Sequence, residues 1–383
     1  MNLLYLSLSY IPSRRASSVH VMRMSAALSR AGHQVELVGK QNREPRDSNL
    51  DDHAFYGVDP TFTITKLPKP AFRGGGLVFA GAMARTLLAR RSTIDLVYSR
   101  ELIGALVAAE LRIPVVFESH GVETSRPLRA LTRRLARHPM LRGMVAISDA
   151  LRRDLEAEQM APAHAPLVIA HDAADAPGAV NLERPRRARP KVGYVGSLYA
   201  GRGIELILEL AKRLPDYDVE LVGGTEADLA KWRAYGLAPN VTLVGFVPPS
   251  TLRARYESFD VLLMPHPKHG VAAATGIDIS RWTSPMKMFE YMASGTPLVA
   301  SDLPVLAEVL RHEHNALIAP ADDLPAWEAA VRRLVDDRAL ARSIASRAYD
   351  DLVEHYTWDA RVKTIFTGLG SLGTESRNSV TAA

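Results

Sequence analysis

The sequence predicts an α/β protein made of two doubly wound, Rossmann-like domains that face each other across a cleft. Strand-like apolar runs alternate with helix-like segments through nearly all of the 383 residues, which is typical of parallel sheets covered by helices on both faces. The length suggests two domains, each with room for a core. Residues 177–190, rich in proline and arginine, divide the pattern into two sets and are the expected linker.

In the first half, residues 1–176 are expected to form one parallel sheet. Apolar runs of strand length predict strands at 3–9, 34–39, 61–67, 94–98, 114–118, 144–147 and 166–170. Apolar residues at helical spacing predict helices at 18–31, 76–91, 101–111, 127–138 and 149–159.

In the second half, residues 191–357 repeat the alternation as a second domain. Strands are predicted at 192–195, 219–222, 241–244, 261–264, 298–300 and 316–318. Helices are predicted at 203–214, 226–235, 249–258, 285–294, 304–311, 324–336 and 338–355, and a last helix starts at Trp358. Ligands of such sheets bind at the carboxyl ends of the strands, so two facing domains would enclose one cleft.

The segment 284–297 is the strongest candidate for a binding element. Ser284 is expected to be a helix N-cap, Pro285 the first helical residue, and Gly295 the end of the helix. A helix N-terminus attracts anions, and Lys287 adds a positive charge there. Glu290, one turn further on, could accept hydrogen bonds from vicinal hydroxyls such as those of a ribose. The alternative interpretation is an exposed Lys–Glu pair.

The turn after the strand at 192–195 is a second candidate. Gly196, Ser197 and Gly203 are small enough for a backbone to approach a phosphate, and Arg202 could bind two of its oxygens. Alternatively, the glycines only permit a tight turn.

In the first domain, polar residues follow two strands. The loop after the first strand lacks the Gly-x-Gly-x-x-Gly pattern, which argues against a dinucleotide dehydrogenase. Its Ser17, Ser18 and His20 suit an acceptor with hydroxyl and anionic groups, although a solvated loop is an equal alternative. Glu118 and His120 end a buried strand, where His120 could contact a sugar hydroxyl.

Composition also excludes several classes of chemistry and of protein. The chain has no cysteine, which excludes disulfides and thiolate chemistry. No His/carboxylate cluster has metal spacing, and no apolar run is long enough for a membrane span. The N-terminus reads as a strand and not as a signal peptide, so a cytoplasmic protein is expected.

Charge is uneven along the chain. Residues 1–190 hold 27 Lys and Arg against 18 Asp and Glu, and residues 191–383 hold 20 against 24. A basic first half suggests contact with something anionic, such as a phospholipid surface, a lipid-phosphate acceptor or nucleic acid. The arginine-rich amphipathic segment 125–142 could lie on anionic lipid. Alternatively, it is an ordinary solvated face.

Taken in order, the motifs resemble the retaining nucleotide-sugar glycosyltransferases of the GT-B fold, glycosyltransferase family 4 (glycosyl transferases group 1). The likeness covers nearly the whole chain. It rests on residues 31–35, 95–100, 118–121, 145–149, 195–197, 202–203, 221–224, 244–247, 260–265 and 289–300.

The resemblance implies a role for each segment. Glu290 would hold the donor ribose, while Arg202 and the helix start, with Ser284, Pro285, Met286 and Lys287, would hold the pyrophosphate. The base would lie near Phe246 and Val247, and His120 would contact the transferred sugar. The family implies no metal and no cofactor, a glycan or lipid-linked acceptor, and no nucleic acid partner. A C-terminal helix at 358–372 would pack back on the first domain, ahead of a disordered tail at 373–383. Contact with the inner face of the cell membrane is also expected.

Two positions depart from the family pattern. Trp282 stands where the family has the first of two paired glutamates, and Asp278 is a candidate substitute. Ser197 stands where an arginine usually follows the glycine, which leaves more of the phosphate charge to Arg202. A nucleotide-sugar epimerase of the same fold, or a non-catalytic nucleotide-sugar-binding protein, are therefore the alternatives.

Overall fold

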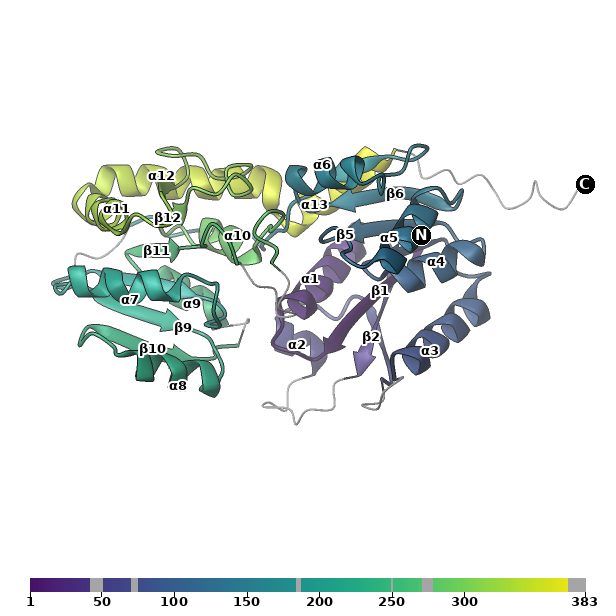
Figure 1. Cartoon of the computed structure of the whole chain (residues 1–383), viewed down its shortest axis with the longest axis horizontal. Coiled ribbons are helices and arrows are strands. Elements are labelled where there is room, and N and C mark those ends of the chain that lie inside the picture. Colours follow the sequence, from purple (N-terminus) through teal and green to yellow (C-terminus); the bar gives the residue numbers. More distant parts are fainter. Residues whose placement is uncertain (42–50, 70–74, 184–186, 249–250, 271–277, 371–383) are drawn as a thin grey trace, which may run out of the picture.

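The computed structural model describes residues 1–41, 51–69, 75–183, 187–248, 251–270 and 278–370. Two parallel sheets organise these residues (Figure 1). The first has seven strands in the order β3-β2-β1-β4-β5-β6-β7. Their bounds are β1 (Asn2–Ile11), β2 (Gln34–Gln41), β3 (Thr63–Leu67), β4 (Leu96–Ser99), β5 (Val115–Ser119), β6 (Leu141–Ala146) and β7 (Leu167–Ile169).

Helices cover both faces of this sheet. They are α1 (Ala16–Arg30), α2 (Asp52–Tyr56), α3 (Gly75–Arg90), α4 (Leu102–Glu110), α5 (Arg126–Ala136) and α6 (Asp149–Ala157). Side chains of Ser125 and Ser148 cap α5 and α6 by accepting a backbone N–H of the first turn. The sequence did not predict α2, which Asp51 caps, because five residues are too few for a periodic apolar pattern.

The second sheet has six strands in the order β10-β9-β8-β11-β12-β13. They are β8 (Lys191–Val195), β9 (Asp218–Val222), β10 (Val241–Gly245), β11 (Val261–Met264), β12 (Leu298–Ser301) and β13 (Leu317–Ala319). The helices are α7 (Ile204–Arg213), α8 (Glu226–Tyr235), α9 (Leu252–Glu257), α10 (Met286–Ala293), α11 (Leu324–Asp336) and α12 (Arg338–Asp351), followed by the π-helix η2 (Leu352–Tyr356). The doubly wound, two-domain fold class is thereby confirmed.

The predicted helix at 304–311 is wrong. Residues 304–309 form successive turns, in which hydrogen bonds reach back three residues at Leu306 and four residues at Ala307. The apolar residues from Leu303 to Leu310 pack into the second domain's core, while Glu308 is turned towards the first domain. These tertiary contacts outweigh local helix propensity.

The last helix, α13 (Trp358–Leu369), lies on the first domain (Figure 1, yellow). It packs against α1 and β7, and Gly143 of β6 leaves room for its Leu369. The chain thus crosses between the domains twice, and the two crossings touch where Ala174 bridges to Thr357. Residues 371 and 372 of the expected helix, and the expected tail at 373–383, lie outside the described residues.

The domains contact each other through specific polar groups. Glu308 of the second domain accepts hydrogen bonds from the backbone N–H groups of Asp149 (2.7 Å) and Ala150 (2.9 Å), at the start of α6. The Trp282 indole N–H donates to Asp154 of the same helix at 2.6 Å. A carboxylate is favourable at a helix N-terminus, so this contact holds the second domain against α6.

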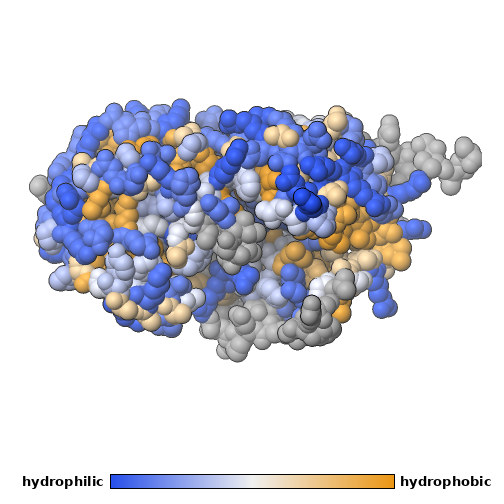
Figure 2. Space-filling model, in the orientation of Figure 1, coloured by the Kyte–Doolittle hydropathy of each residue, from blue (hydrophilic) through white to orange (hydrophobic). Residues whose placement is uncertain are grey.

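On the face shown in Figure 2 the surface is mostly polar, with an apolar region over α3, where Val78 and Leu88 are exposed. Among the described residues, no helix combines the length and apolar character needed to cross a bilayer. The basic helix predicted at 127–138 is α5, whose Arg129 and Arg134 are paired with Glu158 and Glu110. The expected contact with anionic membrane therefore gains no support from this helix.

Candidate active site

The start of α10 lies where the carboxyl ends of β8 and β11 meet. Its N-cap is Pro285, without a side-chain cap, and Gly295 follows the helix in a left-handed conformation (φ 65°). The expectation that Ser284 caps this helix is wrong. The Ser284 hydroxyl instead accepts the backbone N–H of Asp172 at 2.8 Å and joins the two domains.

Two cations near this helix start rest on tyrosine side chains. The Lys287 ammonium lies 4.3 Å from the Tyr194 ring centroid and donates to the Tyr194 hydroxyl at 3.1 Å. The Arg202 guanidinium lies 4.8 Å from the Tyr199 ring centroid and hydrogen-bonds its hydroxyl. Burial, and then the positive charge of Arg202, holds the pKa of Lys287 well below its usual range. Each cation thus rests on a tyrosine ring near a helix N-terminus, an arrangement that suits the binding of an anion.

The positive charges of Lys287 and Arg202 both act on His266. His266 lies two residues after the end of β11 and is fully buried, and neither ring nitrogen has a hydrogen-bond partner among the described residues. Burial, and then the positive charges of Lys287 and Arg202, lowers the pKa of His266 well below its usual value. The imidazole is therefore neutral, and both cations act on the carboxyl end of β11.

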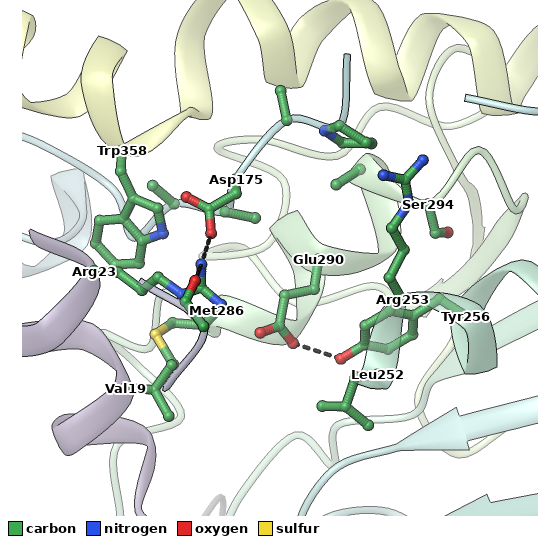
Figure 3. Close-up of a pocket in the computed structure, with 16 residues that line it drawn as sticks. Val19, Arg23, Asp175, Leu252, Arg253, Tyr256, Met286, Glu290, Ser294 and Trp358 are labelled. Carbon is green, nitrogen blue, oxygen red and sulfur yellow. Dashed lines mark hydrogen bonds and ion pairs between the residues drawn. The ribbon is translucent and has the colours of Figure 1, made fainter. Parts of the chain in front are cut away.

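Glu290, one helical turn beyond Lys287 in α10, lines a cavity of about 260 Å³ at the hinge between the domains (Figure 3). It accepts a hydrogen bond of 2.7 Å from the Tyr256 hydroxyl. Arg23, ion-paired with Asp175, and Trp358 line the cavity from the first domain and from α13. Burial raises the pKa of Glu290. The cavity joins elements of both domains around one carboxylate.

The small residues of the β8 turn have structural roles in addition to any donor contact. Gly203 has φ 74°, and a Cβ there would lie 1.6 Å from the Pro265 carbonyl oxygen. A Cβ at Gly196 would lie 3.2 Å from the Tyr194 hydroxyl. The carbonyl of Ser197, which is exposed, accepts a hydrogen bond from that hydroxyl at 2.9 Å. Gly203 is thus required where the start of α7 packs against Pro265, the residue after β11.

The expected base site lies after β10. Phe246 is half-buried, and the Arg14 guanidinium of the first domain lies 4.0 Å from its ring centroid. Val247 packs against the second domain's core. This contact brings the loop after β1 up to the loop after β10, so the carboxyl ends of the two sheets face each other.

Trp282, which stands in place of the first paired glutamate, and Asp278, its candidate substitute, both make structural contacts. Trp282 lies against Gly121, where an added Cβ would be 3.4 Å from the indole ring. Its indole N–H donates to Asp154 of α6. The Asp278 carboxylate accepts backbone N–H groups of Gly270 (3.0 Å) and Ser280 (2.9 Å). Because both Asp278 oxygens stabilise their own loop, we do not retain this residue as a substitute for the first glutamate.

In the first domain, polar residues predicted to meet an acceptor are instead buried. Ser18 donates to the Tyr10 carbonyl at 2.9 Å. The His20 ring nitrogens lie 3.1 Å from Glu118 and 3.0 Å from Asp172. Ser18, His20 and Glu118 are all at most 1 % exposed, so we do not retain them as acceptor contacts. Ser17, on the same turn as Ser18, is exposed and stays a prediction.

Glu118 is the centre of a buried charge network. Arg361 of α13 contacts Glu118 Oε2 at 3.0 Å and donates to the His171 carbonyl at 2.8 Å. The Tyr98 hydroxyl donates to the same carboxylate. Burial alone would raise the pKa of Glu118, but Arg361 and the histidines hold it well below its usual range. The network ties the C-terminal helix to the carboxyl end of β5.

Both ring nitrogens of His120 are engaged. Nε2 lies 2.6 Å from Glu118 Oε1, and Nδ1 lies 3.1 Å from Arg100 Nη2. Since Arg100 can only donate, Nδ1 is the acceptor and Nε2 carries the proton. Burial, and then Arg100, lowers the pKa of His120 to about 4. A sugar hydroxyl would have to displace Arg100 or Glu118 to bind this ring.

Among the described residues, His20, Glu118 and His120 place ligand atoms within 4.8 Å of one another, as a metal site would require. The shared carboxylate already contacts Arg361, and Arg100 lies 3.5 Å from it. A divalent cation would add to this positive charge, so we assign no metal to the cluster.

The sequence missed several residues of this site: Arg23, Arg100, Tyr194, Tyr199, Tyr256, His266 and Arg361. Arg100 directly follows β4, and His266 lies two residues after β11, and a position just past a strand's carboxyl end is a usable signal. Tyr256 and Arg361 lie in helices, where nothing in the local pattern distinguishes them from surface residues.

Comparison with known proteins agrees with this geometry. A model of Glycosyltransferase Family 4 matches residues 17–171, and a model described as Glycosyl transferases group 1 matches residues 189–337. The phosphatidyl-myo-inositol mannosyltransferase of Mycolicibacterium smegmatis is 24% identical over 92% of this chain and 90% of that protein. The glycogen synthase of Mycobacterium tuberculosis is 25% identical over 88% and 87%.

Solved structures share the fold at low identity. Sucrose-phosphate synthase from Thermosynechococcus elongatus has a TM-score of 0.70 and 17% identity, covering 95% of this chain and 97% of that one. Anabaena Alr3699/HepE in complex with UDP-glucose has a TM-score of 0.68 and 16% identity, covering 97% and 100%. The protein is a glycosyltransferase of the GT-B fold. It belongs to glycosyltransferase family 4, the glycosyl transferases group 1.

Proposed function

We propose that the protein is a retaining glycosyltransferase that moves a sugar from a nucleotide-diphosphate-sugar donor to a glycan or lipid-linked acceptor. The reaction would serve the synthesis of a cell-surface polysaccharide or glycolipid. The main observation in support is that Lys287, in the first turn of α10, and Arg202 each rest on a tyrosine ring, and the positive charges of both act on buried His266. A helix N-terminus with two such cations matches the charge of a diphosphate.

In this proposal the protein stabilises the leaving group. The bond from the anomeric carbon to the diphosphate oxygen breaks, a bond to the acceptor oxygen forms on the same face, and the acceptor proton passes to the departing phosphate. Lys287 and Arg202 would balance the developing negative charge without a metal. Glu290, oriented by Tyr256, would accept hydrogen bonds from the ribose hydroxyls.

Two relatives support the choice of substrates. The HepE structure holds UDP-glucose, and the mycobacterial relative is named for transfer of mannose to phosphatidyl-myo-inositol. For this chain, the nucleotide sugar and the lipid-linked acceptor are our proposal.

The test is incubation with a panel of UDP-, GDP- and ADP-sugars while nucleoside diphosphate release is measured. Slow release without acceptor, from one donor of the panel, is the expected result. Interconversion of the sugar without release would indicate an epimerase. Tight donor binding without any turnover would indicate a non-catalytic binding protein, and either result would contradict the proposal.

A further inference from the structure

Lys40 and Lys69 form an unusual pair of cations at the carboxyl edge of the first sheet. Lys40 is paired in register with Tyr10 of β1 and Leu67 of β3, and is only 8 % exposed. Its ammonium lies 5.3 Å from the Tyr10 ring centroid and 5.5 Å from that of Phe79. The Lys69 ammonium lies 5.9 Å from the same Tyr10 ring. Two strand ends thus bring two ammonium groups to one aromatic side chain.

In the part of the chain that the structure describes, neither ammonium forms an ion pair with a carboxylate. Among the described residues, no carboxylate oxygen lies within 4.0 Å of Lys40 or Lys69, whereas neighbouring Lys66 is ion-paired with Asp52. Glu101, whose negative charge acts on Lys40, is already engaged, because its carboxylate accepts the N–H groups of Ile103 and Gly104 at the start of α4. Two ammonium groups close together in a partly buried site repel each other, and a bound anion would offset this repulsion.

The charge environment agrees with this geometry. Burial, then the positive charges of Lys69 and Arg15, lowers the pKa of Lys40 to about 8, while Glu101 acts in the opposite direction. Arg14, next to Arg15, touches Phe246 of the second domain. The lysine pair therefore lies on the edge of the first domain that faces the donor domain, where an acceptor would enter.

We infer that Lys40 and Lys69 bind a phosphate group of the acceptor beside the Tyr10 ring. This inference rests on the proposed function and narrows its acceptor to molecules that carry a phosphate ester. Three ammonium donors on each lysine can reach separate phosphate oxygens, and the aromatic faces hold the lysine stems in place. The phosphate could belong to a lipid headgroup or to a soluble phosphate ester.

The experiment measures binding of glycerol phosphate to the full-length protein by calorimetry. Lys40→Met, Lys69→Met and the double variant are compared with Lys66→Met, which removes the same charge from a neighbouring strand position that already has a carboxylate partner. We expect each single variant of the pair to bind with an affinity reduced by up to about tenfold. The double variant should show no detectable binding. Lys66→Met and Arg202→Ala should keep the affinity. The last comparison separates this site from the donor phosphates.

Vesicles of phosphatidylcholine with and without phosphatidylinositol distinguish the source of the phosphate. Binding to the anionic vesicles that the double variant loses identifies a lipid headgroup, and glycerol phosphate binding alone identifies a soluble ester. Equal glycerol phosphate affinity in the wild type and the double variant would overturn the inference, as would no binding by the wild type. A separate titration with nucleoside diphosphates tests the donor site, so its failure would count only against the proposed function.

Discussion

Tyr256 donates a hydrogen bond of 2.7 Å to Glu290 across the wall of the hinge cavity. Burial raises the pKa of the Tyr256 phenol well above its usual value, so the hydroxyl stays protonated and remains a donor. One carboxylate oxygen is thereby fixed, and Figure 3 shows the other pointing away from Tyr256, into the cavity. A carboxylate held in this way is oriented before a ligand arrives.

Replacing Glu290 should strongly reduce catalysis. Glu290→Ala is expected to lower kcat/KM by about 2–4 kcal/mol of transition-state stabilisation, because it removes the acceptor for the donor hydroxyls. Tyr256→Phe keeps the carboxylate and loses only its orienting bond, at a cost of about 1 kcal/mol. Steady-state release of nucleoside diphosphate measures both. Equal effects of the two substitutions would argue against a direct role of Glu290.

The buried carboxylate of Glu290 should lower the stability of the folded protein at neutral and alkaline pH. A carboxylate whose folded pKa is raised stabilises the protein below its usual pKa, and this stability is lost as pH rises through the folded value. Glu290→Gln should therefore raise the melting temperature at pH 8 and change it less near pH 4, while activity falls. Thermal melts across this range measure the difference. A lower melting temperature at pH 8 would show that the charge is not destabilising.

Arg202 should contribute through its charge and its shape. Arg202→Ala is expected to cost about 2–4 kcal/mol in kcat/KM, and Arg202→Lys to recover part of this, because lysine keeps the charge without the fork of donors. Tyr199→Phe, which removes the hydroxyl that Arg202 contacts, is the matched control and should have the smallest effect. Full activity of Arg202→Ala would exclude it from the donor site.

Glu308 should hold the domains together. Glu308→Ala removes both hydrogen bonds to the start of α6 and should cost about 1–2 kcal/mol of the contact between the domains. We expect a larger radius of gyration in small-angle scattering and a higher donor KM. Glu354→Ala, a substitution of an exposed glutamate in η2, is the control. An unchanged radius together with an unchanged KM would mean that other contacts set the domain arrangement.

Arg361 should be essential for stability of the first domain. Arg361→Met leaves buried Glu118 without its main counter-charge and is expected to cost about 3–5 kcal/mol at neutral pH. Because the folded pKa of Glu118 is depressed, its stabilising effect is present above its usual pKa and lost as pH falls through the folded value. The cost of Arg361→Met should therefore shrink in acid. Adding Glu118→Gln to Arg361→Met should recover part of the lost stability, because it removes the unpaired buried charge. Chemical denaturation measures the free energy of unfolding of each variant, and no recovery in the double variant would contradict this account.

The sequence predicted the parts of the fold that depend on local pattern. Alternating apolar runs indicated both parallel sheets, and the strand–loop–helix arrangement placed Lys287, Glu290 and Arg202 at the carboxyl edge of the second sheet. The pairing of Tyr256 with Glu290 could not be predicted, because it depends on how α9 packs beside α10.

Local propensity also failed where a tertiary contact competed with it. Ser284 has the preferred chemistry of an N-cap, yet its hydroxyl is taken by Asp172 of the other domain. His20 and Glu118 are polar residues near the carboxyl ends of the first sheet's strands. The sequence gives no sign that Arg361 pairs with Glu118 and Asp172 with His20 in the folded protein. Such residues read as exposed until their distant partners are known.

The central claim is that the donor diphosphate binds at the start of α10, and a crystal structure with a bound nucleoside diphosphate tests it most directly. We predict phosphate oxygens within hydrogen-bond distance of Lys287 and Arg202, with the ribose hydroxyls at Glu290. A nucleotide bound elsewhere, with both cations still resting on Tyr194 and Tyr199, would contradict the account.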